Sequence, residues 1–325
     1  MRAIQIDRHG GPEVMQVVEL PVGEPGPGEV RVRHHACGLN FIDIYHRTGL
    51  YPVPLPSVLG TEAAGVVEAI GAGVTHLAIG DRVAYVARTV GSYADARVLA
   101  AAQVVRLPDA ISFATGAAMM LKGLTVQYLL RRTRVELPAG TSIVWHAAAG
   151  GVGLIACQWA RALGLRLIAT AGTDAKCALA REHGAAHAIN YRTEDVVARV
   201  RAITGGAGVP VVFDPVGKDT WERSLDCLAP LGVMVSFGNA SGPVPPIALG
   251  QLAQKGSLYV QRPTLATYTA TREDTDAMAR ELFAVVASGQ VVIPPPREYP
   301  LAEAVRAHRE LEGRQTTGAG VLIPG

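Results

Sequence analysis

Strands and helices alternate strictly from residue 141 to residue 264, and this alternation restricts the fold more than any other feature of the sequence. Six apolar, β-prone segments are separated by segments with helical spacing of their apolar residues. The predicted strands are TSIVWHA, LRLIATA, HAIN, VPVVFDPV, LGVMVSFG and LYVQRPT. Chains of this order form an α/β fold, so we expect a doubly wound, parallel six-stranded sheet.

The remainder of the chain has a different character. From Met1 to Pro108, short β-rich segments are separated by turns rich in glycine and proline, which is typical of a compact barrel-like or sandwich domain. After Arg262 come a long helix over residues 273–288, the strand-like VVIPPPREYPL, the helix AEAVRAHRELEG and a final strand. This tail does not extend the alternation, so we expect it to pack on the first domain.

The composition is that of an ordinary globular protein, with 49% hydrophobic residues, 18% charged residues and a formal net charge of +2. This balance gives no electrostatic bias toward nucleic acid or membranes. No signal-peptide pattern and no run of about 18 apolar residues is found, so we expect a cytoplasmic protein without membrane insertion. The four cysteines form no C-x-x-C pair and are expected to be reduced.

The stretch HAAAGGVG, residues 146–153, follows the first predicted strand of the alternating region and precedes a predicted helix. Ala148, Gly150 and Gly153 fit the relaxed dinucleotide-binding fingerprint. Its first position needs a small residue for the turn, its second brings backbone N–H groups to a pyrophosphate, and its third lets helix and strand pack closely. The stretch therefore predicts a dinucleotide site.

The end of the second strand indicates which dinucleotide binds. NAD-binding proteins usually carry an acidic residue there, whereas this strand ends at Ala171, Gly172 and Thr173. Lys176 follows as a point-charge ligand for a 2′-phosphate, so NADPH fits better than NADH. We interpret the nearby Asp174 as a helix N-cap.

Motifs along nearly the whole chain carry a family resemblance. They are HGGPEV, NFIDIYHRTGLYP, GTEAAG, LKGLTVQYLL, HAAAGGVGLIACQWA, DTWERSLDCL, MVSFGN and KGSLYVQRP. Together they resemble the NADPH-dependent quinone reductases of the medium-chain dehydrogenase/reductase superfamily, zeta-crystallin included. The resemblance implies a GroES-like catalytic domain over residues 1–122, a Rossmann domain over 123–264, and a C-terminal segment, 265–325, that returns to the first domain.

The chain departs from the zinc-dependent members of that superfamily at two ligand positions. Asn40 stands in N-F-I-D where zinc alcohol dehydrogenases have a cysteine in C-G-T-D, and Thr61 stands where they have the histidine of G-H-E. The cysteine-rich loop of their structural zinc is missing as well. Zinc needs three or four good ligands, so we expect no metal and an electron-poor acceptor such as a quinone.

The resemblance also implies which residues contact NADPH in a cleft between the domains. The residues of the pyrophosphate turn and the 2′-phosphate end are Gly150, Gly151, Val152, Gly172, Lys176 and Tyr191. Those near the nicotinamide and its ribose are Asn40, Asp43, Thr125, Phe237, Gly238 and Asn239, with Arg314 reaching the cofactor from the C-terminal segment.

Asn40, Tyr45 and Tyr51 are the candidate catalytic residues. The two phenols flank the expected metal-free site and can donate a hydrogen bond to a quinone oxygen, although packing in the core or in a turn explains them equally well. Water is the other candidate proton donor.

Two other functions stay open at this point. One is reduction of an activated alkene, such as an enal or an acrylate, and the other is a crystallin-like role that binds NADPH with little turnover. RNA binding is disfavoured, because basic and aromatic residues are not clustered. A homodimer is expected, formed at the sheet edge by the sixth strand, residues 258–264.

Because Asn40 and Thr61 occupy the ligand positions, the purified protein should hold no stoichiometric zinc and should keep full activity after exhaustive chelation. Metal analysis and an activity assay before and after chelation measure this. Activity that is lost on chelation and restored by added zinc would contradict it.

Overall fold

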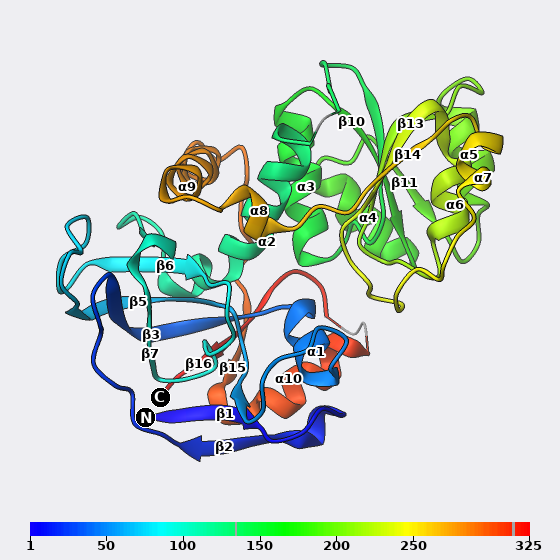
Figure 1. Ribbon diagram of the computed structural model, residues 1–325. Helices are drawn as coiled ribbons and strands as arrows, with labels where there is room; N and C mark the ends of the chain where they lie inside the picture. Colours follow the sequence, from blue (N-terminus) through cyan, green and yellow to red (C-terminus); the bar gives the residue numbers. More distant parts are fainter. Residues whose placement is uncertain (134, 314–315) are drawn as a thin grey trace. The chain divides into compact units, whose positions relative to one another are not determined.

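The computed structural model describes three stretches of the chain, which are residues 1–133, 135–313 and 316–325 (Figure 1). They form two compact units. Unit 1 consists of Met1–Leu124, Thr269–Ala287 and Ile293–Gly325. Unit 2 consists of Thr125–Tyr268 and Ser288–Val292.

Unit 2 is built on a six-stranded sheet in the order β11-β10-β9-β12-β13-β14, in which every neighbouring pair is parallel. Its strands are β9 (Ser142–Trp145), β10 (Arg166–Ala171), β11 (His187–Asn190), β12 (Val209–Asp214), β13 (Leu228–Ser236) and β14 (Tyr259–Gln261). The predicted doubly wound parallel sheet is thereby confirmed. Strand order reverses between β9 and β12, and sheets of this kind bind ligands at the carboxyl ends of the strands beside such a reversal.

Helices cover both faces of this sheet (Figure 1). Two of them lie on one face, α3 (Gly151–Ala162) and α4 (Asp174–Glu182). On the other face lie α5 (Val196–Ile203), α6 (Trp221–Asp226) and α7 (Gly250–Gln254). Because both faces are covered, the strands are apolar almost throughout, and Val144, Ile168 and Val212 have no exposed surface.

Unit 1 contains two sheets. The small one has the order β2-β1-β4, from β1 (Arg2–Ile6), β2 (Met15–Glu19) and β4 (Ser57–Val58). The large one has the order β15-β16-β3-β5-β6-β8, with β7 also paired to β3. Its strands are β3 (Glu29–Leu39), β5 (Glu62–Ile70), β6 (Arg82–Val86), β7 (Ala96–Ala100), β8 (Val104–Arg106), β15 (Arg297–Pro300) and β16 (Gly320–Ile323). Alternate residues of β3, among them Val30, Val32 and Ala36, are fully buried, as expected for an antiparallel strand with one core face.

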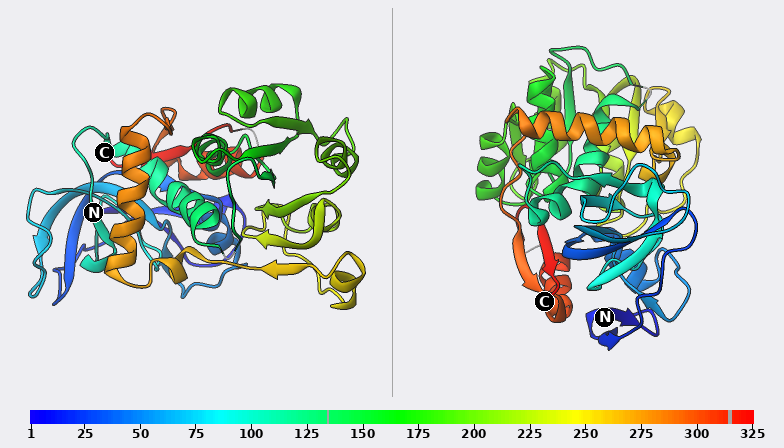
Figure 2. Two further views of the ribbon diagram at one scale, coloured as in Figure 1. Left: turned by 90° about the horizontal axis from the view of Figure 1, so that it is seen from above. Right: turned by 90° about the vertical axis from the view of Figure 1, so that its left-hand side faces the viewer.

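The C-terminal part of the chain lies largely within unit 1. It comprises α9 (Arg272–Ala287), β15, α10 (Ala304–Glu312) and β16, which pairs antiparallel with β3 (Figure 2). Strand β15 is shorter than the predicted segment, because Pro294, Pro295 and Pro296 have no N–H to donate to a sheet. The two ends of the chain are in contact, because the Arg2 guanidinium donates a hydrogen bond to the Gly325 carbonyl at 2.9 Å.

Helix α1 (Phe41–Thr48) belongs to unit 1. Helix α2 (Phe113–Arg131) begins in unit 1 and ends in unit 2. A single helical turn, α8 (Leu265–Tyr268), precedes α9. Helix α2 has no distinct polar face and is buried along most of its length. Within the described stretches, none of the helices has both the length and the apolar character needed to cross a bilayer.

Candidate functional site

The stretch HAAAGGVG forms the turn between β9 and α3, beside the reversal of strand order. Gly150 is the N-cap of α3, so no side chain caps the first N–H groups of the helix. These groups and the helix dipole can therefore face an anion. A Cβ added to Gly153 would lie 2.4 Å from the Ala148 carbonyl oxygen, so only glycine fits this third position of the fingerprint. The geometry fits a pyrophosphate.

A buried hydrogen-bond network lies under this turn and was not predicted from the sequence. His146 contacts Thr170 Oγ1 through Nδ1 at 2.8 Å and Ser224 Oγ through Nε2 at 2.9 Å, and Ser224 donates to Asp214 Oδ2 at 2.8 Å. Because the Ser224 hydroxyl proton goes to Asp214, Nε2 of His146 carries the proton that Ser224 accepts. Burial lowers the pKa of His146, so the ring is neutral. The network joins β9, β10 and β12 to α6 at the end of the sheet that carries the turn.

The end of β10 requires glycine at Gly172, because a side chain there would meet its neighbours. An added Cβ would lie 2.6 Å from the Tyr191 hydroxyl and 3.6 Å from Arg192 Nε. Tyr191 and Arg192 therefore lie beside the backbone of Gly172, where the sequence predicts the 2′-phosphate end of the cofactor. Arg192 was not predicted, although an arginine next to Tyr191 adds a second cation to this region.

The predicted N-cap at Asp174 is wrong. The N-cap of α4 is Thr173, whose hydroxyl oxygen accepts the backbone N–H of Lys176 at 3.2 Å. Asp174 is the first helical residue, and its carboxylate accepts a hydrogen bond from Asn190 Nδ2 at 2.8 Å. The hydroxyl of Thr173 can satisfy the N–H groups of the first turn, which leaves the Asp174 carboxylate for the end of β11.

The predicted nicotinamide loop follows β13. Gly238 lies against Pro215, since an added Cβ would be 2.3 Å from its carbonyl oxygen, and Phe237 packs on Trp145 with ring centroids 5.5 Å apart. The Arg262 guanidinium donates to the Gly238 carbonyl at 3.2 Å. Phe237, Gly238 and Asn239 are thus held at the carboxyl ends of β12 and β13. Thr125, the other residue of unit 2 predicted to lie near the nicotinamide, is on α2 and is 8% exposed.

Asn40, at the N-cap of α1 in unit 1, lies between two buried charged side chains. Its Nδ2 donates to Glu62 Oε2 at 2.7 Å, and its Oδ1 accepts from Lys122 Nζ at 2.7 Å. Lys122 and Glu62 are themselves 3.8 Å apart. Burial raises the pKa of Glu62 and lowers that of Lys122, and the attraction between the two opposes both shifts.

These side chains do not fit a zinc ion. Asn40 and Thr61 are weak ligands, the Glu62 carboxylate is already hydrogen-bonded, and Lys122 brings an ammonium group to the same place. In the described part of the chain, no group of three or more His, Cys, Asp or Glu side chains could hold a metal ion.

Asp43, predicted to lie near the nicotinamide and its ribose, has no exposed surface. Its Oδ2 accepts the backbone N–H of Asn40 and the Tyr93 hydroxyl, both at 2.9 Å. The Tyr93 hydroxyl also lies 3.2 Å from His308 Nε2 on α10, and His308 contacts Arg47 at 3.0 Å. Asp43 therefore fixes the backbone of Asn40 and ties α1 to α10.

The two predicted tyrosines lie together near the end of α1. The rings of Tyr45 and Tyr51 meet edge to face with centroids 5.1 Å apart, and Tyr45 is 9% exposed. Arg314 lies outside the described residues. The structure thus groups Asn40, Asp43, Glu62 and Lys122 in one buried cluster, with Tyr45 further along α1 and Tyr51 just beyond the end of that helix.

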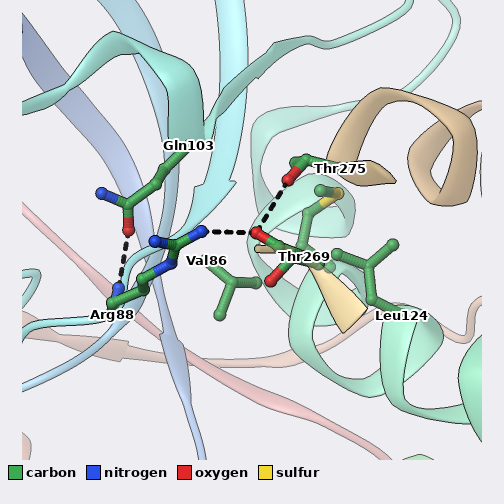
Figure 3. A pocket seen from close by; sticks show the side chains of 7 residues that line it. Val86, Arg88, Gln103, Leu124, Thr269 and Thr275 are labelled. Carbon is green, nitrogen blue, oxygen red and sulfur yellow. Dashed lines mark hydrogen bonds between the residues drawn. The ribbon is translucent and has the colours of Figure 1, made fainter. Parts of the chain in front are cut away.

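A separate small cavity in unit 1 is lined by Val86, Arg88, Gln103, Met120, Leu124, Thr269 and Thr275 (Figure 3). The Arg88 guanidinium crosses it and donates to the Thr269 carbonyl at 2.6 Å. Its volume of about 10 Å³ is enough for one water molecule and far too small for a nicotinamide or a quinone.

Comparison with known proteins agrees with this geometry. Residues 26–109 match the alcohol dehydrogenase GroES-like domain, and residues 151–283 match the zinc-binding dehydrogenase family. A quinone oxidoreductase of Pseudomonas aeruginosa is 56% identical over 324 residues, which cover 99% of both chains. This chain belongs to the quinone oxidoreductase family.

Two further relatives of this quinone oxidoreductase family member bear on its chemistry. The crystal structure of Escherichia coli quinone oxidoreductase complexed with NADPH superimposes with a TM-score of 0.98 at 52% identity and covers all of both chains. A 2-haloacrylate reductase from a Burkholderia species is 43% identical over 330 residues, which cover 99% of this chain and 98% of the relative.

Sequence analysis missed Lys122 in this family member, although a signal was present. Lys122 is the single charged residue in the apolar stretch AAMMLKGLTVQYLL. A lone charge in an apolar helix indicates a buried partner, because an unpaired ammonium is rarely buried. Nothing in the sequence indicated which carboxylate or amide that partner would be.

The Asp43 carboxyl should make stability depend on pH. Burial raises its pKa in the folded protein to about 7, against about 3.9 for an unfolded chain. Between these values the folded state binds the extra proton, so the free energy of unfolding should fall as pH rises from 5 to 8, by about 2.7 kcal/mol. Asp43→Asn keeps an oxygen acceptor and removes the titration. Its free energy of unfolding, measured by urea unfolding at each pH, should therefore lack this decline. Asp109→Asn, at a 99% exposed carboxylate, is the control and should keep the wild-type slope. Equal slopes for wild type and Asp43→Asn would contradict the prediction.

Proposed function

We propose that this protein is an NADPH-dependent quinone reductase. The observation that carries the proposal is the pairing of two features, a glycine-rich turn at the reversal of strand order and an Asn40 cluster whose side chains do not fit zinc. The P. aeruginosa and E. coli quinone oxidoreductases, at 56% and 52% identity, support the same conclusion.

In this proposal the residues of unit 2 bind and orient the cofactor. Gly150, Gly151 and Val152 present backbone N–H groups to the pyrophosphate, while Lys176, Tyr191 and Arg192 surround the 2′-phosphate beside Gly172. The loop Phe237–Asn239 and Thr125 would lie near the nicotinamide, and Arg314 keeps its predicted role. NADPH, when bound, supplies the hydride, so the protein chiefly positions an intrinsically reactive pair.

Asn40 would be the side chain of unit 1 nearest the reacting atoms. Its backbone N–H is held by the Asp43 carboxylate. Tyr45 and Tyr51 are the proposed hydroxyl donors to the acceptor oxygen. A reduced quinone is basic enough to take its proton from water, so a dedicated acid is not required.

Reduction of an activated alkene is the second candidate, favoured by the 43% identity to a 2-haloacrylate reductase. An electron-poor alkene accepts hydride without a metal for the same reason that a quinone does. The higher identity to quinone oxidoreductases favours the quinone as acceptor.

The proposal includes a homodimer and a cytoplasmic location. Strand β14 is an edge strand whose residues Tyr259 and Val260 are 60% and 41% exposed, as expected of a strand that pairs with another copy. All four cysteines are free and buried, which suits a reducing compartment.

NADPH oxidation should proceed rapidly with a simple quinone and more slowly with 2-chloroacrylate. Without an added acceptor, the rate should be negligible. Absorbance of NADPH measures all three rates under matched conditions. A higher kcat/KM for the alkene would favour the second candidate, and no turnover with either acceptor would contradict both in favour of a binding role.

Lys176→Ala should weaken NADPH binding far more than NADH binding, because only NADPH carries the 2′-phosphate. A charge-assisted hydrogen bond contributes roughly 1.5–3 kcal/mol, or about 10- to 150-fold in affinity. Fluorescence titration of both dinucleotides measures the ratio, with Lys255→Ala as a control lysine that pairs with Asp226 and Glu222. An equal loss for both dinucleotides would remove Lys176 from the phosphate site.

A further inference from the structure

The buried trio of Asn40, Glu62 and Lys122 has a chemistry that the proposed function does not itself require, and the following inference rests on that function. We infer that Lys122 and Glu62 are positioning residues that hold the Asn40 amide in one orientation, so that its remaining N–H and the nearby ammonium charge stabilise the negative charge on the acceptor during hydride transfer.

The two neighbours leave the Asn40 amide only one orientation. An ammonium group has donors only, so it must face Oδ1, and an ionised carboxylate has acceptors only, so it must face Nδ2. The distances of 2.7 Å on both sides are those of charge-assisted hydrogen bonds. A flipped amide would place donor against donor and acceptor against acceptor, and each mismatch in a buried site is costly.

The neighbours are themselves held in place. Lys122 Nζ also donates to the Leu39 carbonyl at 3.3 Å, and Glu62 Oε1 accepts the backbone N–H of Leu121 at 2.7 Å. A Cβ on Gly38 would lie 2.2 Å from Glu62 Oε2, so glycine is needed there for the carboxylate to reach Asn40. The trio therefore joins the end of β3 and the middle of α2 to the start of β5 without depending on a ligand.

One N–H of the amide remains available for the substrate. Among the hydrogen bonds of the described residues, Nδ2 makes one, to Glu62, and it has a second hydrogen. Glu62 has no exposed surface, whereas Asn40 and Lys122 keep 4% and 6% of theirs exposed. The Lys122 ammonium faces Asn40 Oδ1 and the Leu39 carbonyl, so Asn40 is the member of the trio whose second N–H can touch an acceptor.

The reaction explains why a fixed positive charge is useful here. A hydride, with its electron pair, is transferred from NADPH to the acceptor, and NADP⁺ remains. The acceptor is then an anion until water supplies one proton. The negative charge gathers on the acceptor oxygen. An N–H donor placed before the reaction begins stabilises that charge without reorganisation, and an ammonium bonded to Oδ1 makes the N–H a stronger donor.

Three variants separate orientation from charge. Lys122→Met removes both, Lys122→Gln keeps a neutral donor to Oδ1, and Lys122→Met/Glu62→Gln removes the two buried charges together, so that neither is left unpaired. The double variant guards against a single variant that fails to fold. Lys255→Met is the matched control, because it removes another ion-paired lysine, in unit 2.

Steady-state kinetics with 1,4-benzoquinone, NADPH affinity by fluorescence and the thermal unfolding midpoint are measured for each variant. We expect Lys122→Met and the double variant to lose about 10- to 100-fold in kcat, with NADPH affinity within about twofold of wild type. Lys122→Gln should recover part of that loss, and Lys255→Met should match wild type.

Two results would overturn the inference: a folded double variant with wild-type kcat, or a loss of kcat matched by an equal loss of NADPH affinity. If wild type itself reduces neither a quinone nor 2-chloroacrylate, the proposed function fails first. Normal wild-type turnover with unaffected Lys122 variants would contradict this inference alone.

Discussion

Buried charges and polar groups must find partners inside the protein, because an unpaired one costs several kcal/mol in an apolar core. Both units satisfy this constraint for most polar groups at the places where function is expected, although Asp43 Oδ1 and Thr61 Oγ1 are buried without a hydrogen-bond partner among the described residues. In unit 1, Asn40 forms hydrogen bonds with both Lys122 and Glu62. The Asp43 carboxylate accepts hydrogen bonds from the Tyr93 hydroxyl and the Asn40 backbone N–H. In unit 2, His146 and Asp214 are joined through Ser224 under the phosphate turn.

These networks make the candidate sites rigid before a ligand binds. A hydride acceptor or a pyrophosphate then meets donors that are already oriented, and little binding energy is needed to arrange them. The separation of tasks follows from the two kinds of architecture. The parallel sheet of unit 2 ends its strands at one edge and suits a dinucleotide, while in unit 1 a charge from β5 and one from α2 meet beside the start of α1.

Asn40 and Thr61 stand where zinc ligands would be, and Lys122 brings an ammonium group to the same place. The positive charge at this site therefore comes from a side chain and not from a metal ion. A zinc site needs several strong donors around one cation, whereas here a carboxylate and an amide surround an ammonium group that is covalently part of the chain. A cation of this kind cannot polarise a carbonyl as strongly as zinc does, which agrees with an acceptor that is already electron-poor. Relatives that act on quinones and on a haloacrylate fit that description.

The sequence by itself determined the parallel sheet, the position of its phosphate turn, the preference for a 2′-phosphate and the replacement of the zinc ligands, because each depends on local spacing or on one residue type. It also predicted Asn40, Lys176 and Tyr191 as site residues, and it assigned the cap of α4 to Asp174, whereas Thr173 provides it. Only the tertiary structure decided which distant residues meet. Asn40, Glu62 and Lys122 come from three elements far apart in the chain, and Asp43 becomes a buried support because Tyr93 and His308 close over it. Local pattern carries no information about such contacts, since they arise when separate elements pack and their buried polar groups must pair.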